Sequence, residues 1–442
     1  MSARPWQVWG LTAIGALMLL LTGAGLALQH GDAHDGFVAV ALIQGVLYLV
    51  TAALTWRGGF PRRVLVGILA VAALMRLGIL LAPPYLSDDL YRYIWDGRVE
   101  AAGINPYRYI PSDTHLAALR DEAIYPNINR RTYAPTIYPP AAELIFLLTT
   151  RISESVTWMK ATMVVFDFTS IAILVRLLLL GGLPLERIVI YAWHPVVLWE
   201  FAGSGHIDAA IVTFVALALW ARRREAAWLT GIALAGAALV KFFPAVIFPA
   251  LYRRWDWKMP VAAAATVAVA YLPFLAAGRG VLGFLPGYVR EEGLNSGAGF
   301  FLWNLLRAAV PAASTSNVPY LAFAAAVLGS LGIYVMLSDR AGDRYVASAG
   351  AFAVAFTVLL SPHFPWYFAW IVAFLCFMPA TSILYLSVAS LLLYFVSGGP
   401  DLDGSRLLIE AAIYGPFAVL AVLEMWRRHT AKLRPGWIKA EV

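Results

Sequence analysis

The chain has little charge and almost no cysteine. Only 13% of its 442 residues are charged, and Cys376 is its single cysteine. One cysteine excludes an intramolecular disulfide and a cysteine-based zinc cluster. The low charge, together with 61% hydrophobic residues, excludes an ordinary soluble globule. No Lys/Arg block within a polar domain is of the kind that binds nucleic acid, so we expect no nucleic-acid partner. The composition instead predicts an all-α polytopic membrane protein.

Apolar runs long enough to cross a bilayer recur along the whole sequence. We predict about 11–14 membrane-spanning helices in a single transmembrane domain that covers residues 1–442. The expected helical segments are 7–28, 37–56, 64–82, 156–180, 187–203, 207–221, 226–241, 243–252, 259–277, 317–337, 345–361, 365–379, 381–396 and 407–425. Lys241 and Pro244 interrupt the segment 226–252, which favours a broken hairpin over two full spans.

The distribution of basic residues predicts the orientation of these helices. The net charge is +7, and arginines concentrate in the connection Arg57–Arg63, in the run Arg222–Arg224 and in the tail 426–442. Positive residues mark cytoplasmic loops, so we expect both termini in the cytoplasm. A long loop (83–155) and two shorter ones (278–300 and 397–406) then lie on the outer side. Within the long loop, 113–120 predicts a short helix, and 136–151 predicts a helix at the membrane interface.

The sequence Ser-Asp-Asp-Leu-Tyr-Arg-Tyr-Ile-Trp-Asp-Gly follows the third span directly. Its carboxylates therefore lie where a membrane helix meets water, and charged groups at that position of a mostly apolar protein need an explanation. Asp88 and Asp89 either complement a helix start capped by Ser87, or one of them is a general base in a cleft. Adjacent helical residues point about 100° apart, so we expect one to face the cleft and the other to hold the helix start. The spacing does not say which; of the two we favour Asp89 as the base. Arg92 and Asp96 have i,i+4 spacing, which predicts a supporting ion pair.

Other polar groups fall at the same outer level. They are Glu200, His206 and Asp208 in one turn, Lys241 at the break in 226–252, and His363 between two prolines. Each has an ordinary structural alternative, such as helix capping, a satisfied buried histidine or a lysine that snorkels to the interface. Their convergence favours a polar site. His206 and Asp208 have i,i+2 spacing, which does not predict a metal site.

A cationic set of Lys241, His363 and His206 suits an anionic group such as a lipid phosphate. Tyr91, Tyr138, Trp366 and Tyr367 lie near the same level. Such aromatic residues form interfacial belts, and they also line sugar-binding clefts, where Asp208 and Asp96 would support the site. For most of them we favour the belt.

Several short motifs resemble the membrane glycosyltransferases of the C superfamily that use polyprenyl-phosphate sugars. The resemblance rests on the acidic segment and on five shorter motifs. These motifs are Gly-Ile-Asn-Pro-Tyr (103–107), Tyr-Pro-Pro (138–140), Gly-His-Ile-Asp-Ala (205–209), Val-Lys-Phe-Phe-Pro (240–244) and Ser-Pro-His-Phe-Pro-Trp-Tyr (361–367). In this order they are similar to glycosyltransferase family 87 and its mycobacterial alpha-1,6-mannosyltransferase relatives. These relatives often have Asn where Ile207 stands here.

The resemblance implies an enzyme of the bacterial inner membrane with its active site on the outer side. It implies inverting transfer of a hexose, most simply mannose, from a polyprenyl phosphate to a lipid or glycan hydroxyl, with a loop aspartate as base. We expect no required cofactor, although the carboxylates leave room for a divalent cation, and we expect a monomer surrounded by membrane lipids. The alternative is a lipid or solute transporter; the absence of an internal repeat and the outer position of the polar residues argue against it.

Overall fold

The computed structural model describes residues 4–310, 316–338, 344–378, 380–396 and 404–433. Helices make up most of this part of the chain and no β-strand occurs in it, which confirms the predicted all-α fold. Seven helical segments in it are long and apolar enough to cross a bilayer. They are α1 (Pro5–His30), α2 (His34–Thr55), α3 (Arg62–Leu80), α6 (Val156–Leu180), the segment Lys258–Glu291, α15 (Val318–Leu337) and Arg406–Arg427 within α19 (Gly404–Leu433). The chain is therefore a polytopic membrane protein.

Shorter helices complete the bundle, and most of the predicted spans contain one of them. They are α9 (Asp208–Arg223), α10 (Ala227–Val240), α16 (Arg344–Leu360), α17 (Ala369–Leu375) after the 3-10 turn η7 (Pro365–Phe368), and α18 (Thr381–Ala389) with η8 (Ser390–Phe395). A helix rises 1.5 Å per residue, so segments of this length cover only part of a bilayer about 30 Å thick. Helices therefore exist at the predicted positions, but they are shorter than the predicted spans or broken.

The prediction of one helix over 187–203 is wrong. This stretch consists of four short pieces: η3 (Leu185–Ile188), α7 (Val189–Ala192), α8 (Pro195–Val197) and the π-helical turn η4 (Leu198–Gly203). Pro195 has no backbone N–H and holds His194 extended, at φ −67° and ψ 124°, which ends α7. The pieces are almost wholly buried, so protein rather than lipid satisfies the interrupted backbone.

The predicted break after α10 is confirmed. Lys241 is extended, with φ −148° and ψ 146°, and it ends the helix. The chain continues in η5 (Phe243–Ile247), which contains Pro244, and in α11 (Phe248–Leu251). The break presents the Lys241 side chain within the protein.

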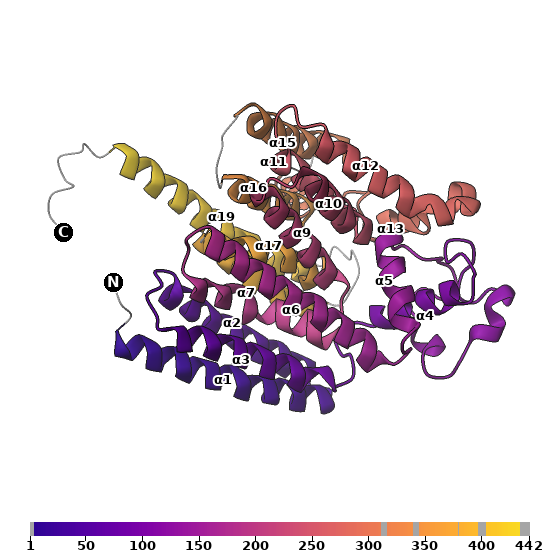
Figure 1. The fold of residues 1–442 in the computed structure, drawn as a ribbon, viewed down its shortest axis with the longest axis horizontal. Coiled ribbons are helices and arrows are strands. Elements are labelled where there is room, and N and C mark those ends of the chain that lie inside the picture. Colours follow the sequence, from indigo (N-terminus) through magenta and orange to yellow (C-terminus); the bar gives the residue numbers. More distant parts are fainter. Residues whose placement is uncertain (1–3, 311–315, 339–343, 379, 397–403, 434–442) are drawn as a thin grey trace.

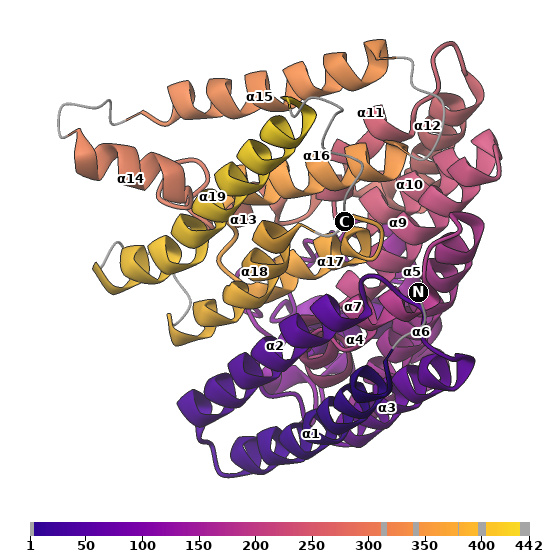
Figure 2. The same ribbon diagram turned by 90° about the vertical axis from the view of Figure 1, so that its left-hand side faces the viewer.

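The long predicted loop gathers at one end of the bundle. Helices α4 (Asp89–Ala101) and α5 (Pro140–Thr150) lie there, whereas α1 begins and α19 ends at the opposite end (Figure 1). Seen at right angles, α1, α2 and α3 lie on one side of the bundle, and α14 (Phe301–Ala309) and α15 lie on the other (Figure 2). The predicted short helix is present as η1 (Thr114–Leu119), capped by Asp113, and α5 occupies most of the predicted interfacial segment.

The second predicted loop, 278–300, is more ordered than its composition indicates. Helix α12 (Lys258–Tyr271) continues through the 3-10 segment η6 (Leu272–Leu282) to α13 (Leu285–Glu291), which packs beside the acidic end of α4. Residues 397–403 of the third predicted loop and 434–442 of the basic tail lie outside the described residues.

Candidate active site

Helix α4 carries the acidic segment and neighbouring helices hold it in place. Lys160 of α6 is buried and donates to the carbonyl oxygens of Ile79 and Ala82, 3.0 and 2.6 Å away, so a cation caps the end of α3 just before α4 begins. Gly97 brings α4 against α5 so closely that a β-carbon there would lie 2.5 Å from the Phe146 carbonyl oxygen. The acidic residues therefore stand on a firmly packed helix.

Arg92 and Asp96 form the supporting pair that their spacing predicts. Nε of Arg92 lies 2.8 Å from Oδ1 of Asp96, and both side chains are buried. Arg92 also donates through Nη1 to the carbonyl oxygen of Ala134, 3.1 Å away. The pair ties α4 to the loop that follows and does not line either cavity described below.

Asp88 and Asp89 meet at one amide group. Nδ2 of Asn129 donates to Oδ1 of Asp89 at 2.6 Å and to Oδ1 of Asp88 at 3.0 Å. Oγ of Ser87 accepts from the backbone N–H of Asp89 at 3.2 Å, which is the local helix-start contact that the sequence suggests. Asp88 is exposed, whereas the Asp89 side chain is only 20% exposed. Asp89 is thus the carboxylate that the protein encloses.

Burial governs the acidity of Asp89. Removal from water raises the pKa of its carboxyl above the ordinary value, and the Asp88 carboxylate adds to the effect. Lys241, Arg130 and the Asn129 hydrogen bond act in the opposite direction without cancelling the rise. A carboxylate of raised pKa is a stronger base than an exposed aspartate.

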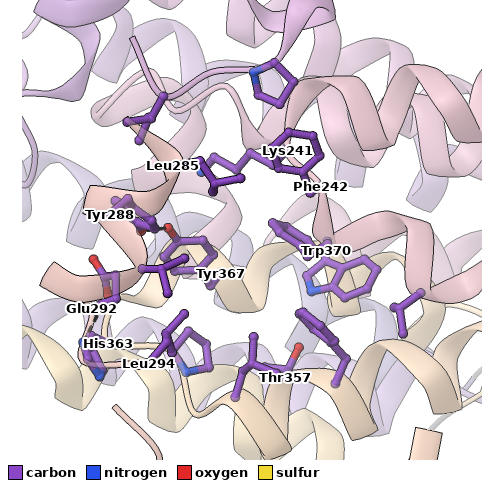
Figure 3. A pocket seen from close by; sticks show the side chains of 18 of the residues that line it. Lys241, Phe242, Leu285, Tyr288, Glu292, Leu294, Thr357, His363, Tyr367 and Trp370 are labelled. Carbon is purple, nitrogen blue, oxygen red and sulfur yellow. Dashed lines mark hydrogen bonds and ion pairs between the residues drawn. The ribbon is translucent and has the colours of Figure 1, made fainter. Parts of the chain in front are cut away.

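Asp89 opens into a polar chamber of about 380 Å³. The chamber walls come from the acidic segment, from loop residues 129–138, from the break after α10, from α13 and its end, and from the turn 364–367. Beside it runs an apolar groove of about 470 Å³ (Figure 3). The two cavities share six wall residues: Ile137, Tyr138, Lys241, Tyr288, Glu292 and Tyr367. An apolar groove and a carboxylate-bearing chamber therefore meet at Lys241.

Lys241 is the cation at this junction. Its Nζ lies 2.6 Å from Oδ2 of Asp208 and 4.9 Å from the centre of the Tyr367 ring. The Tyr367 hydroxyl is hydrogen-bonded to that of Tyr288. Asp208 is buried behind the lysine and outside the chamber wall, so it holds Lys241 in place. Figure 3 shows the lysine and both tyrosines around one space.

His206 lies behind the chamber instead of in its wall. Its ring is buried and stacks on Trp366, with 4.2 Å between the ring centres. Nε2 lies 3.3 Å from Oε2 of the buried Glu200, and Nδ1 lies 3.9 Å from Oδ2 of Asp89. Trp366 covers the ring, so His206 has no direct access to a phosphate in the chamber. It stands between Glu200 and Asp89, and its Nδ1 is hydrogen-bonded to the Tyr93 hydroxyl at 3.5 Å.

His363 lines the apolar groove and not the chamber. Its Nδ1 is 3.2 Å from Oε2 of Glu292, a contact drawn in Figure 3. Of the aromatic residues singled out in the sequence, Tyr138, Trp366 and Tyr367 line the chamber, and Tyr91 does not. The structure therefore gathers Asp88, Asp89, Lys241 and three aromatic residues in one chamber, and places His363 along the adjoining groove.

Several wall residues are absent from the sequence prediction, among them Asn129, Arg130, Tyr288 and Glu292. Asn129 and Arg130 lie in the long loop, Tyr288 lies in α13 and Glu292 caps the end of that helix, and none of them belongs to a recognised motif. Arg130 has φ 53°, a conformation that is unusual for a residue with a side chain, and its Nε lies 2.6 Å from Oε2 of Glu291. This ion pair joins the long loop to α13. A charged residue in a polar loop carries no local signal of such a contact.

The described residues contain no group of three or more His, Cys, Asp or Glu side chains that could hold a metal ion. The carboxylates that face the chamber are Asp88, Asp89 and Glu292. Magnesium needs only one or two protein carboxylates when substrate phosphate and water supply the other ligands, so Asp88 and Asp89 are the residues that would hold it.

Comparison with known proteins gives one match. Residues 8–256, more than half of the chain, match the family model described as alpha-(1→6)-mannopyranosyltransferase, N-terminal domain. The matched region contains α4, Asn129, His206, Asp208 and Lys241. No curated protein and no solved structure match the chain.

Proposed function

Because the chain belongs to the alpha-(1→6)-mannopyranosyltransferase family, we propose that it transfers mannose from a polyprenyl-phosphate donor to a lipid or glycan hydroxyl, with inversion at the anomeric carbon. Family membership favours glycosyl transfer over transport. The observation that carries the finer proposal is the meeting of an apolar groove with a carboxylate-bearing chamber at Lys241.

The groove suits the first isoprene units of a lipid chain. Its wall is apolar over most of its length, with Phe242, Phe243, Val246 and Trp370 among its side chains. A nucleotide-linked sugar would place its charged, hydrogen-bonding nucleotide against this wall, where those polar groups would find no partners. A polyprenyl chain buries the same wall without that cost. The shape and polarity of the groove therefore support a lipid-linked donor.

The donor phosphate belongs at the junction of the two cavities. Lys241 supplies a fixed positive charge there, and the hydrogen-bonded pair of Tyr288 and Tyr367 hydroxyls leaves one O–H free to donate to the phosphate. His363, which lines the groove beside Glu292, is the second phosphate contact in this proposal. These groups stabilise the negative charge that grows on the departing phosphate, which is the largest electrostatic demand of the reaction. Phosphate is a good leaving group, so a strong general acid is unnecessary.

The mannose ring then occupies the chamber against Tyr138 and Trp366, whose flat faces suit a sugar. The acceptor hydroxyl attacks the anomeric carbon opposite the bond to phosphate. Asp89 takes the hydroxyl proton as the new C–O bond forms and the old one breaks. Asp88 remains the water-facing partner that shares Asn129. The products are the mannosylated acceptor and a polyprenyl phosphate.

His206 is better suited to positioning than to binding phosphate. It stands between Glu200 and Asp89 and is shielded by Trp366. Nδ1 of the ring is hydrogen-bonded to the Tyr93 hydroxyl at 3.5 Å and lies 3.9 Å from Oδ2 of Asp89, so the imidazole would position the carboxylate by packing beside it and not by a hydrogen bond. We assign it this role in place of the direct phosphate contact that the sequence suggests.

In this proposal the chamber faces the outer side of the bacterial inner membrane, and both termini are cytoplasmic. The loop arginines support this orientation. The enzyme acts as a monomer and requires no cofactor; a divalent cation at Asp88 and Asp89 would assist phosphate departure.

Incubation of the purified protein with polyprenyl-phosphate mannose tests the proposal. Membrane lipids and mannose oligosaccharides serve as acceptors, products are identified by mass spectrometry, and the anomeric configuration of the new bond is determined by NMR. We expect product with the lipid-linked donor and none with a nucleotide-linked mannose, with or without chelator. Product from the nucleotide donor alone, or retention of the donor configuration, would refute the donor or the mechanism respectively.

A further inference from the structure

Two arginines that have no side-chain partner among the described residues line a second groove at the far end of the bundle from the active site. The groove lies between α6 and α9 and has a volume of about 490 Å³. Its wall is made of apolar side chains such as Ile173, Leu180 and Leu217, together with Arg176 and Arg224. The proposed active site contains none of these residues.

The position of the groove follows from the course of the two helices. Both α6 and α9 begin near the acidic end of the molecule and run away from it. A helix of 25 residues such as α6 is about 37 Å long, enough to reach the opposite membrane face. Arg176 stands four residues before the end of α6, and Arg224 caps the end of α9. The groove therefore opens at the face that the topology assigns to the cytoplasm.

Arg176 lies about one helical turn inside the end of a membrane-spanning helix, where a charge needs a partner. It is exposed, as is Arg224, and within the described part of the chain neither guanidinium has an ion pair or a hydrogen bond. The nearest acidic residue in sequence, Glu225, pairs with Arg253 at 3.1 Å. Neighbouring Arg223 instead donates to the carbonyl oxygen of Leu180 at 2.9 Å. The two positive charges in the groove are therefore available to bind an anionic group from outside the protein.

We propose that this groove binds an anionic phospholipid of the cytoplasmic leaflet. Its phosphate contacts Arg176 and Arg224, and an acyl chain lies along the apolar wall with Trp220 at the interface. Two guanidinium groups above an apolar surface match a phosphate with an attached chain in both charge and polarity. A zwitterionic lipid carries its own positive charge beside the phosphate, so it gains less binding free energy from the two arginines than an anionic lipid does. The lipid fills the space between α6 and α9, the helices that carry Lys160 and Asp208 at their other ends.

Native mass spectrometry of the full-length protein in detergent tests this proposal. Phosphatidylglycerol and phosphatidylcholine with identical acyl chains are titrated in separate samples, with glycerol phosphate as a headgroup without a chain. We expect tighter binding of phosphatidylglycerol. An exposed basic residue contributes about 1 kcal/mol to anionic lipid binding, so Arg176→Gln and Arg224→Gln should each weaken it about five-fold and the double variant about thirty-fold.

Arg63→Gln is the matched control, because Arg63 lines a separate groove between α1 and α3 and carries the same charge. It should leave the affinity within two-fold of the unaltered protein. Four outcomes would overturn the proposal. The first three are equal binding of the two lipids, an affinity unchanged in the double variant, and a loss in Arg63→Gln as large as in the double variant. The fourth is competition by glycerol phosphate at the affinity of the whole lipid, which would show an anion site that does not recognise lipid. The test does not require the protein to transfer mannose.

Discussion

Nδ2 of Asn129 lies 2.6 Å from Oδ1 of Asp89, although 40 residues separate them in the sequence. The contact holds the enclosed carboxylate in one orientation and favours its charged form. Because a hydrogen bond to a charged group contributes about 1.5–3 kcal/mol, we expect Asn129→Ala to lower kcat at least about ten-fold. The acid limb of the pH–rate profile should move to higher pH, since loss of the bond raises the pKa of Asp89 further.

Asn127→Ala is the control for this variant. Asn127 lies in the same loop, and its side-chain amide donates to the carbonyl oxygen of Ala123, 2.9 Å away. Its kcat and pH profile should match those of the unaltered protein. A normal rate and an unshifted acid limb in Asn129→Ala would contradict the role assigned to Asn129.

Lys241 and Asp208 form a buried pair whose members can be separated by mutation. Removing one partner of a buried ion pair costs about 3–5 kcal/mol because the other charge stays unpaired. Lys241→Met alone should therefore lower the melting temperature strongly. Lys241→Met combined with Asp208→Asn should fold normally and still fail to transfer mannose. Transfer at the normal rate by this folded double variant would show that Lys241 does not bind the donor phosphate.

Gly205 lets the turn before α9 approach α4. Its φ is 73°, and a β-carbon there would lie 2.3 Å from Cδ1 of the buried Leu90, next to Asp89. The left-handed conformation alone costs alanine about 1–2 kcal/mol, and the clash adds to this. We expect Gly205→Ala to lower both the melting temperature and kcat.

Gly182→Ala is the control that separates backbone strain from the steric clash with Leu90. The φ of Gly182 is 62°, and no atom lies within 4 Å of the added carbon. The variant should show the loss in melting temperature that strain causes and keep its activity. Equal activity in the two variants would mean that the position of Leu90 does not matter for catalysis.

Glu100 makes stability depend on pH. Burial raises the pKa of its carboxyl from 4.5 to about 7, with a smaller contribution from Asp96. The folded state therefore holds the proton more tightly than the unfolded state. This stabilisation is complete below pH 4.5 and is lost as the pH rises through 7. Melting temperatures measured from pH 4.5 to 8 should fall less steeply for Glu100→Gln than for the unaltered protein; parallel curves would contradict this assignment.

The sequence predicts the all-α fold and most helical segments because apolar length is a local property. It also identifies Asp89, Lys241 and Tyr367, since each follows a break in an apolar run. It misses Asn129 and Tyr288, because their roles depend on contacts between segments far apart in the sequence. The sequence favours Asp89 over Asp88 without a physical reason, and the structure supplies one, since side-chain enclosure depends on what the helix packs against.

The central claim is that Asp89 is the general base. General-base catalysis contributes about 10²–10⁴-fold to a rate, so Asp89→Asn should lose mannosyl transfer from the lipid-linked donor by at least about a hundred-fold. Asp88→Asn, which removes the exposed carboxylate at the same amide, should retain most of the activity. Both variants should keep the normal melting temperature. The decisive measurement is therefore the transfer rate of Asp89→Asn beside that of Asp88→Asn. A large loss confined to Asp89→Asn is the predicted result, and an undiminished rate in Asp89→Asn would contradict the account.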